Sequence, residues 1–127
     1  MNLVTQRISD YAAGGAVGGA TLSILNAGNM TSIFLSLAIG FVAGAAAGAA
    51  ASVPLPKIRQ GLFVGAAAGL CVGLLRYYLL GTEDSLAKSI FVHVPSLGLT
   101  GLTIRCFTRE SEMTRWFAVP APGKAAS

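Results

Sequence analysis

The chain has 127 residues, of which 54% are hydrophobic and 11% charged, and its formal net charge is +4. A soluble domain usually has about a quarter of its residues charged, so this composition argues against an ordinary soluble protein and favours a membrane protein. The basic residues stand singly at the ends of apolar stretches and in the tail, and do not form a run. This pattern argues against nucleic-acid binding and indicates anchors at a membrane surface.

The chain contains four apolar stretches long enough to cross a membrane, at about residues 9–28, 31–52, 58–80 and 87–105. We therefore predict an all-α fold, a bundle of four transmembrane helices over residues 1–108, followed by a polar interfacial or extended tail over 109–127. The connections are short, so consecutive helices should form antiparallel hairpins. Pro54 and Pro56 should separate the second helix from the third, Gly81 should end the third, and Asp84 or Ser85 should cap the fourth.

Glycine recurs every four residues in the third stretch, at Gly61, Gly65, Gly69 and Gly73. Positions four apart lie on one face of a helix, so the face is bare and another backbone can approach it closely. In water each of these glycines would weaken the helix by roughly 0.5–1 kcal/mol relative to alanine. We predict glycine-zipper packing in lipid, and the first two stretches add Gly14, Gly15, Gly18, Gly19, Gly40, Gly44 and Gly48 to the packing residues.

The fourth stretch carries the single histidine of the chain, His93, together with Pro95. Ionisable side chains inside membranes are rare and often functional. His93 lies within two turns of the predicted helix start, however, where a neutral, hydrogen-bonded structural role is the simpler interpretation. A functional role remains the alternative.

The sequence contains no group of residues that forms a candidate catalytic site. The five acidic residues all lie at or beyond predicted helix ends, and no serine or cysteine is positioned beside His93. We predict a non-enzymatic protein with no catalytic site, metal site, cofactor or small-molecule substrate. Cys71 and Cys106 have neither metal-ligand spacing nor a framework of pairs, and are expected to be free thiols.

Residues at the predicted membrane surfaces are candidates for lipid contact. Arg76, at the end of the third stretch, should extend its side chain to the headgroups, and the phosphate of an anionic phospholipid such as cardiolipin is its expected ligand. The full set of candidate headgroup contacts is Lys57, Arg59 and Arg76, and the candidate interface anchors are Tyr77, Tyr78 and Trp116.

The run Gly61-Leu-Phe-Val-Gly65-Ala-Ala-Ala-Gly69-Leu-Cys-Val-Gly73-Leu-Leu-Arg76, with four spans and further glycine ladders, resembles the mitochondrial inner-membrane import-translocase superfamily. That superfamily includes protein-import channel subunits and an accessory subunit of the membrane arm of respiratory complex I. The import subunits are known for acidic residues facing a lipid-open cavity, whereas Asp10 is the one acid at the edge of a span here. The basic residues that family members often carry between the first two helices are also missing from 26–30.

The resemblance implies a non-catalytic, multi-pass accessory subunit of complex I in the mitochondrial inner membrane, whose partners are hydrophobic subunits and lipids. The alternatives are an import-translocase subunit and a homo-oligomeric glycine-zipper protein. Orientation stays open: the resemblance implies termini in the intermembrane space, whereas the distribution of basic residues would place them in the matrix.

Overall fold

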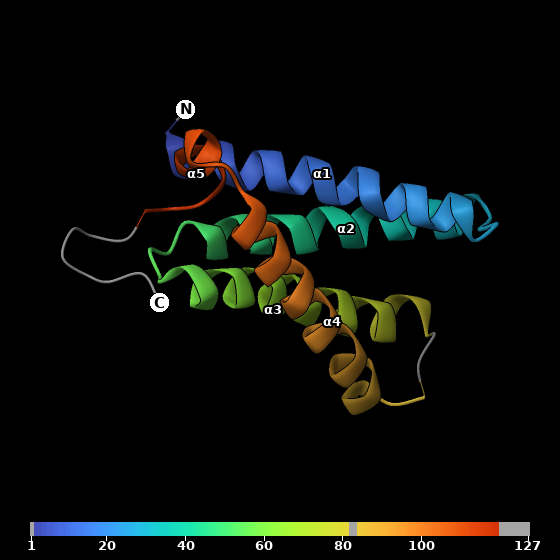
Figure 1. Cartoon of the computed structure of the whole chain (residues 1–127). Helices are drawn as coiled ribbons and strands as arrows, with labels where there is room; N and C mark the ends of the chain where they lie inside the picture. The colour runs from blue at the N-terminus through green and yellow to red at the C-terminus, as the bar shows by residue number, and fades with distance from the viewer. Residues whose placement is uncertain (1, 82–83, 120–127) are drawn as a thin grey trace.

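A computed structural model of the chain describes residues 2–81 and 84–119, and Figure 1 shows how the helices are arranged. Every regular element in this part of the chain is helical, which confirms the all-α prediction. The helices are α1 (Leu3–Leu25), α2 (Met30–Ala51), α3 (Lys57–Leu75) with a π-helical continuation η1 (Arg76–Leu80), α4 (Leu86–Phe107) and the short α5 (Glu110–Trp116).

Three of the described helices are long and apolar enough to cross a membrane: α2, α3 with η1, and α4. The first helix, α1, has 23 residues and is long enough, but is not one of the three. Its glycines and its polar residues, among them Arg7 and Asp10, lower its hydropathy below that of the others. The four predicted spans are thus found as helices, and three of them have the composition of a span.

The ends of the helices carry the residues that sequence reasoning assigned to them. Gly81 ends η1 in the left-handed conformation, with φ of 62°, as its position predicted. The Ser85 hydroxyl accepts a hydrogen bond from the backbone N–H of Lys88 at 3.2 Å and caps α4. Asn29 caps α2 in the same way, accepting from the N–H of Ser32 at 2.8 Å.

The backbones of α1 and α2 approach each other closely at glycines, and so do those of α3 and α4. A Cβ atom added at Gly44 would overlap the Tyr11 carbonyl oxygen, and one at Gly69 would lie 2.7 Å from the Cα atom of Val94. Such separations are too short for any side chain. At Gly14 and Gly18, by contrast, an added Cβ would meet nothing within 4 Å, so these two glycines do not take part in close packing between the described helices.

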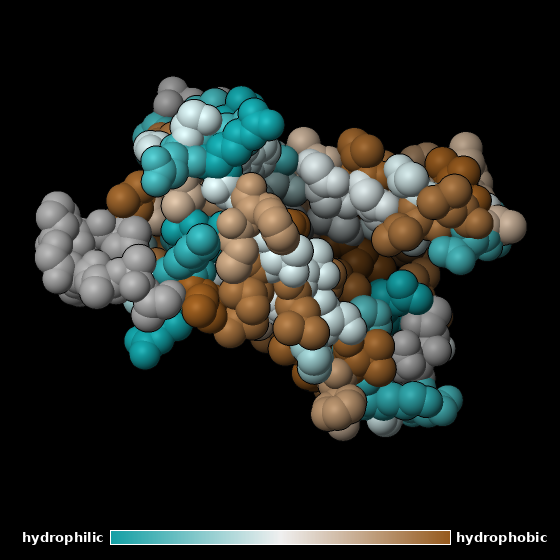
Figure 2. Space-filling view, in the orientation of Figure 1, coloured by the Kyte–Doolittle hydropathy of each residue, from teal (hydrophilic) through white to brown (hydrophobic). Residues whose placement is uncertain are grey.

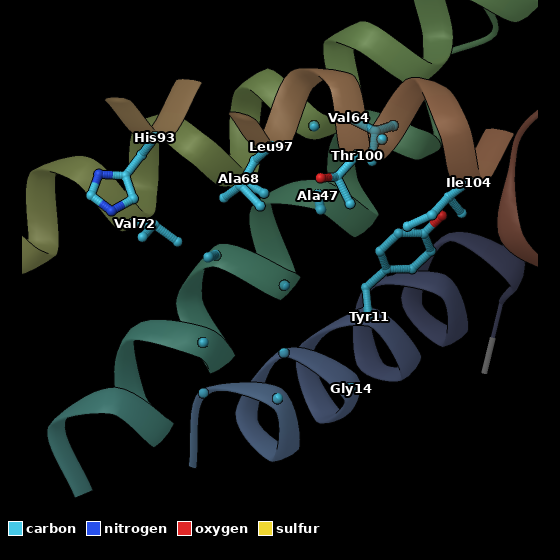
Figure 3. Close-up of a pocket in the computed structure, with 18 of the residues that line it drawn as sticks. Tyr11, Gly14, Ala47, Val64, Ala68, Val72, His93, Leu97, Thr100 and Ile104 are labelled. Carbon is cyan, nitrogen blue, oxygen red and sulfur yellow. The ribbon is translucent and has the colours of Figure 1, made fainter. Parts of the chain in front are cut away.

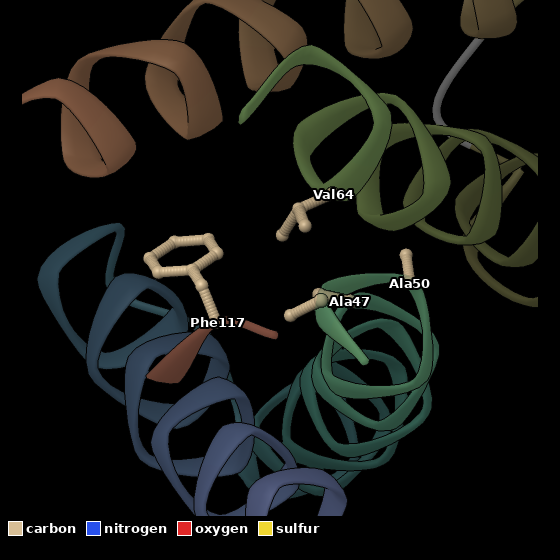
Figure 4. Packing of buried hydrophobic residues seen from close by; sticks show 5 residues of the cluster. Ala47, Ala50, Val64 and Phe117 are labelled. Carbon is tan, nitrogen blue, oxygen red and sulfur yellow. The ribbon is translucent and has the colours of Figure 1, made fainter. Parts of the chain in front are cut away.

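The core lies between α2 and α3, in the middle of the four long helices. It consists mainly of small side chains, and Phe117 from the chain segment after α5 fills its end; the members are Ala47, Ala50, Ala51, Val64 and Phe117 (Figure 4). Phe117 is only 1% exposed. The segment predicted as a polar interfacial or extended tail therefore packs into the bundle up to this residue, while 120–127 lie outside the described part.

The outer helices α1 and α4 diverge. As Figure 1 shows, α4 crosses the direction of the other three long helices obliquely, with its C-terminal end near α5 and the N-terminus of α1. Because α4 does not run alongside α1, the space between these two helices is not filled by helix packing.

Candidate functional site

At one end of the bundle, Arg7 binds the C-terminal segment, which covers that end. We call it the closed end. Arg7 is 3% exposed. Its guanidinium donates hydrogen bonds to the carbonyl oxygens of Thr114 and Arg115 and, at 3.4 Å, to the Ser52 hydroxyl. Buried charge is tolerated here because backbone acceptors surround it.

Gln60 connects three parts of the chain at the same end. It is fully buried, and its Nε2 donates to the carbonyl oxygens of Val53 at 3.1 Å and Ala118 at 2.8 Å. Its Oε1 accepts a hydrogen bond from Nε of Arg105 at 2.8 Å. The Arg105 guanidinium also lies 5.2 Å from the centroid of the Phe117 ring, a cation–π distance.

This network was not predicted from the sequence. The prediction that the basic residues are surface anchors is wrong for Arg7 and Arg105, which are each 3% exposed. A usable signal was present: Gln60 follows Pro56 within the first turn of a helix that begins beside the C-terminus of the preceding one. Carbonyl groups at a helix C-terminus have no partners within the helix and need donors from elsewhere.

A groove of about 960 Å³ lies between α1 and α4, and α2 and α3 form its floor. Figure 2 shows the molecule hollowed between these two outer helices, with hydrophobic residues inside. Figure 3 shows lining residues from all four long helices: Tyr11, Gly14, Ala47, Val64, Ala68, Val72, His93, Leu97, Thr100 and Ile104. The groove stays open because the α1 wall is built from glycines such as Gly14 and Gly18, which have no side chains to fill it.

The two ends of the groove differ in charge. Asp10, Glu112 and Trp116 line one end, beside the C-terminal segment, and Arg76 and Leu80 line the other. At the Arg76 end a second cavity of about 450 Å³ adjoins the groove. Its lining is largely polar and comes from the α1–α2 turn and η1: Leu22, Ser23, Asn26, Gly28, Ser32, Ser36, Arg76 and Leu80.

Arg76 lines both cavities. Its Nε atom is buried and has no hydrogen-bond partner among the described residues. The residue begins the π-helical turn η1, and such turns occur frequently at functional sites. Arg76 is therefore the described basic side chain best placed to receive an anion from outside the chain.

His93 borders the groove from α4 (Figure 3). Its Nδ1 lies 2.8 Å from the Ser89 carbonyl oxygen, and because a carbonyl only accepts, Nδ1 carries the hydrogen. Ser89 is fully buried and donates from its hydroxyl to the Gly73 carbonyl oxygen at 2.8 Å. His93 thus makes the hydrogen bond that its predicted structural role requires.

The other predicted surface residues are spread over both ends. Lys57 and Arg59 are exposed at the start of α3, at the end opposite Arg76. Tyr78 is 68% exposed, and its ring packs edge to face with that of Tyr77. These four residues and Arg76 therefore do not form one site.

Trp116, the third predicted anchor, contacts the protein itself. Its ring packs edge to face against Tyr11 with centroids 5.5 Å apart, and the Tyr11 hydroxyl donates to the Trp116 carbonyl oxygen at 2.9 Å. Trp116 is part of the contact between α1 and the C-terminal segment.

Within residues 2–81 and 84–119, no group of three or more His, Cys, Asp or Glu side chains could hold a metal ion. Cys71 and Cys106 are free, as predicted. Comparison of the chain with protein-family models, with curated proteins and with solved structures finds no match. The arrangement of the groove and of Arg76 is therefore the starting point for a functional proposal.

Proposed function

We propose that the protein is a multi-pass protein of the mitochondrial inner membrane that acts as a non-catalytic accessory subunit of respiratory complex I. It would stabilise the membrane arm of the complex by packing against hydrophobic subunits and by binding lipid. The observation that carries the binding role is the division of the helix surfaces: glycine faces hold the chain together, while large apolar side chains point outward.

The outward side chains are suited to contacts with lipid or with other membrane proteins. Phe34 is 62% exposed, Phe91 77% and Phe107 82%, all on helices with the composition of a span. In water such surfaces would be aggregation-prone, whereas in a membrane they provide docking faces. This supports a protein whose work is done on its outer surface.

The proposal includes α1 as a fourth span. It packs along α2 at Gly15, Gly40 and Gly44, so the two helices share the same depth. The outer face of α1 is apolar, with Val17 67% and Leu25 75% exposed. Its most costly polar group, Arg7, is covered by the C-terminal segment.

The same division of surfaces disfavours the homo-oligomeric glycine zipper. The glycine faces of α2 and α3 are occupied by α1 and α4 of the same chain, as at Gly44 and Gly69, so they are not free to pair with a second copy. The acidic residues Asp10 and Glu112 stand at one end of the groove and not along it. This distribution favours the accessory subunit over an import-channel subunit.

The test is purification of the tagged full-length protein from mitochondria in mild detergent, with partners identified by quantitative mass spectrometry. We expect subunits of complex I in stoichiometric amounts. Stoichiometric import-translocase subunits would replace the proposal with the translocase alternative, and recovery of this chain alone at one oligomeric mass would contradict both.

A pair of glycine variants adds a matched control to this purification. Gly69→Leu should abolish incorporation into the complex, because even its Cβ would lie 2.7 Å from the Cα of Val94. Gly98→Ala, in the α4 helix of the same hairpin, adds a Cβ that meets nothing within 4 Å and should be incorporated normally. Equal incorporation of both variants would contradict the role assigned to close helix packing.

A further inference from the structure

We propose that the groove and the adjoining polar cavity together bind one anionic phospholipid, with its phosphate at Arg76 and an acyl chain lying along α1. This inference rests on the membrane location contained in the proposed function, and not on the identity of the complex. It turns the general expectation of lipid contact into a defined site with two parts.

The polar cavity has the chemistry of a phosphate site. The Nε atom of Arg76 is buried without a hydrogen-bond partner among the described residues. The Arg76 side chain lines this cavity, and the Nη atoms of its guanidinium offer further N–H donors for charge-assisted hydrogen bonds to a phosphate. The hydroxyls of Ser23 and Ser32, whose oxygens lie 3.2 Å apart, line the same cavity and provide further donors.

The depth of Arg76 also suits a headgroup. The residue lies four positions before the end of the helical segment Lys57–Leu80, which has the length and composition of a span. The exposed aromatic side chain of Tyr78 follows within the same turn. Basic and aromatic residues at this position of a membrane helix lie at the level of the headgroups.

The groove has the chemistry and the length for an acyl chain. It shares Leu22, Ser36, Arg76 and Leu80 with the polar cavity, so the two spaces adjoin. Along α1 the groove runs from Asp10 to Leu22, which at the helical rise corresponds to about 18 Å. One leaflet of a bilayer is about 15 Å deep in hydrocarbon, half of the usual core thickness.

Charge decides which way the lipid lies. At the far end of the groove Asp10 and Glu112 would repel a phosphate, and Arg115 at that end already pairs with Asp10 at 3.4 Å. At the near end the described lining of the polar cavity contains Arg76 and no acidic residue. The headgroup therefore belongs at Arg76, and the positive charge favours an anionic lipid.

The experiment measures retention of phosphatidylglycerol by the full-length protein, purified in mild detergent, using native mass spectrometry. We expect a single retained lipid per chain and a preference for phosphatidylglycerol over phosphatidylcholine. Arg76→Gln should lower retention by about tenfold or more, the loss expected for one charge-assisted hydrogen bond. Arg76→Lys, which keeps the charge, should retain most of the lipid.

A second variant tests the groove separately from the headgroup site. Gly18→Leu places a side chain where an added Cβ meets nothing within 4 Å, so it should fill the groove without disturbing helix packing, and retention should fall. Arg109→Gln, at an exposed arginine before α5 that is not among the lining residues of the groove or the polar cavity, is the control and should bind as the wild type does. Circular dichroism and the unfolding midpoint of each variant establish that the fold is intact.

Three outcomes would overturn the inference. Unchanged retention in folded Arg76→Gln would remove the headgroup site. Loss in Arg76→Gln but not in Gly18→Leu, with displacement of the lipid by inorganic phosphate, would mean a free-phosphate site without an acyl groove. Equal retention of phosphatidylcholine would remove the charge preference.

Lipid binding without complex I partners would contradict the proposed function alone, and partners without lipid binding would contradict this inference alone.

Discussion

Buried arginines have different hydrogen-bond partners at the two ends of the bundle. At the end closed by the C-terminal segment, Arg7 donates to backbone carbonyls, and Arg105 donates to Gln60 and lies over the Phe117 ring. At the other end Nε of Arg76 has no partner in the described part of the chain. The difference comes from the C-terminal segment, which supplies acceptors and an aromatic ring to one end only.

The comparison separates a structural end from a binding end. Arg105 is not fully paired either, because its Nη1 lacks a hydrogen-bond partner among the described residues, but its Nε is bound and the Phe117 ring lies against the guanidinium. Where the chain supplies partners to its buried guanidinium groups, even incompletely as at Arg105, the geometry is fixed and no ligand is needed. Where it does not, as at Arg76, a ligand can complete the site.

The largest loss of stability should come from a substitution at Gln60 that removes its hydrogen bonds at the closed end. In Gln60→Leu the Arg105 guanidinium loses its acceptor, and the carbonyls of Val53 and Ala118 lose a donor. We expect the free energy of unfolding to fall by about 3 kcal/mol, since a buried charged donor and buried carbonyls are left unpaired.

The C-terminal segment should also detach in this variant. Trp116 is the single tryptophan of the chain, so its fluorescence reports the docking of this segment directly. Gln6→Leu, at an exposed position of α1, is the matched control and should change neither the fluorescence nor the midpoint of unfolding in mixed micelles. A Gln60→Leu protein as stable as Gln6→Leu would show that the network does not hold the closed end.

A smaller loss of stability should follow from forcing α1 away from α2. These two helices form the hairpin that extends between the two ends of the bundle. The Cβ of Gly44→Ala would overlap the Tyr11 carbonyl oxygen and lie 3.0 Å from the Cα of Ala12. Forcing the helices apart should cost about 1–3 kcal/mol of stability. Gly18→Ala, on the same hairpin, meets nothing within 4 Å and should be neutral or stabilising by up to about 1 kcal/mol, because alanine favours the helix.

Unfolding by SDS in mixed micelles would measure both changes. Destabilisation of the same size in the two variants would contradict the distinction between packed glycines and glycines that line the groove. The distinction matters for the lipid proposal, which requires the α1 wall at Gly18 to be open.

Local signals accounted for most of the fold. The lengths of the apolar stretches predicted the four long helices, and Pro54, Pro56, Gly81 and Ser85 marked their ends. These features depend on residues close together in the sequence, so one sequence is enough to read them. The composition of α1 was the exception, because its glycines make it a close partner of α2 while lowering its hydropathy.

The candidate site was predictable only in part. Arg76 was identified because a basic residue followed by aromatics at the end of an apolar stretch is a local pattern. The groove depends on the oblique path of α4, and the closed end joins Arg7 to Thr114 and Gln60 to Ala118, contacts between distant parts of the chain. Nothing in the local pattern specifies a helix crossing direction or such long-range pairs.

The smallest effect should come from removing one hydroxyl at each end. In Tyr11→Phe the Trp116 carbonyl loses the donor that lies 2.9 Å away in the closed end, which should cost about 1 kcal/mol and shift the Trp116 emission. In Ser23→Ala the lost partner is the Ser32 hydroxyl, which borders the polar cavity of about 450 Å³. Water can enter a polar cavity of this size and replace the bond, so the cost should stay below about 0.5 kcal/mol. If Ser23→Ala lowers the stability more than Tyr11→Phe does, the Ser23–Ser32 hydrogen bond belongs to a packed part of the structure that water does not enter. The chain itself would then fill the end at Arg76, as it fills the other end.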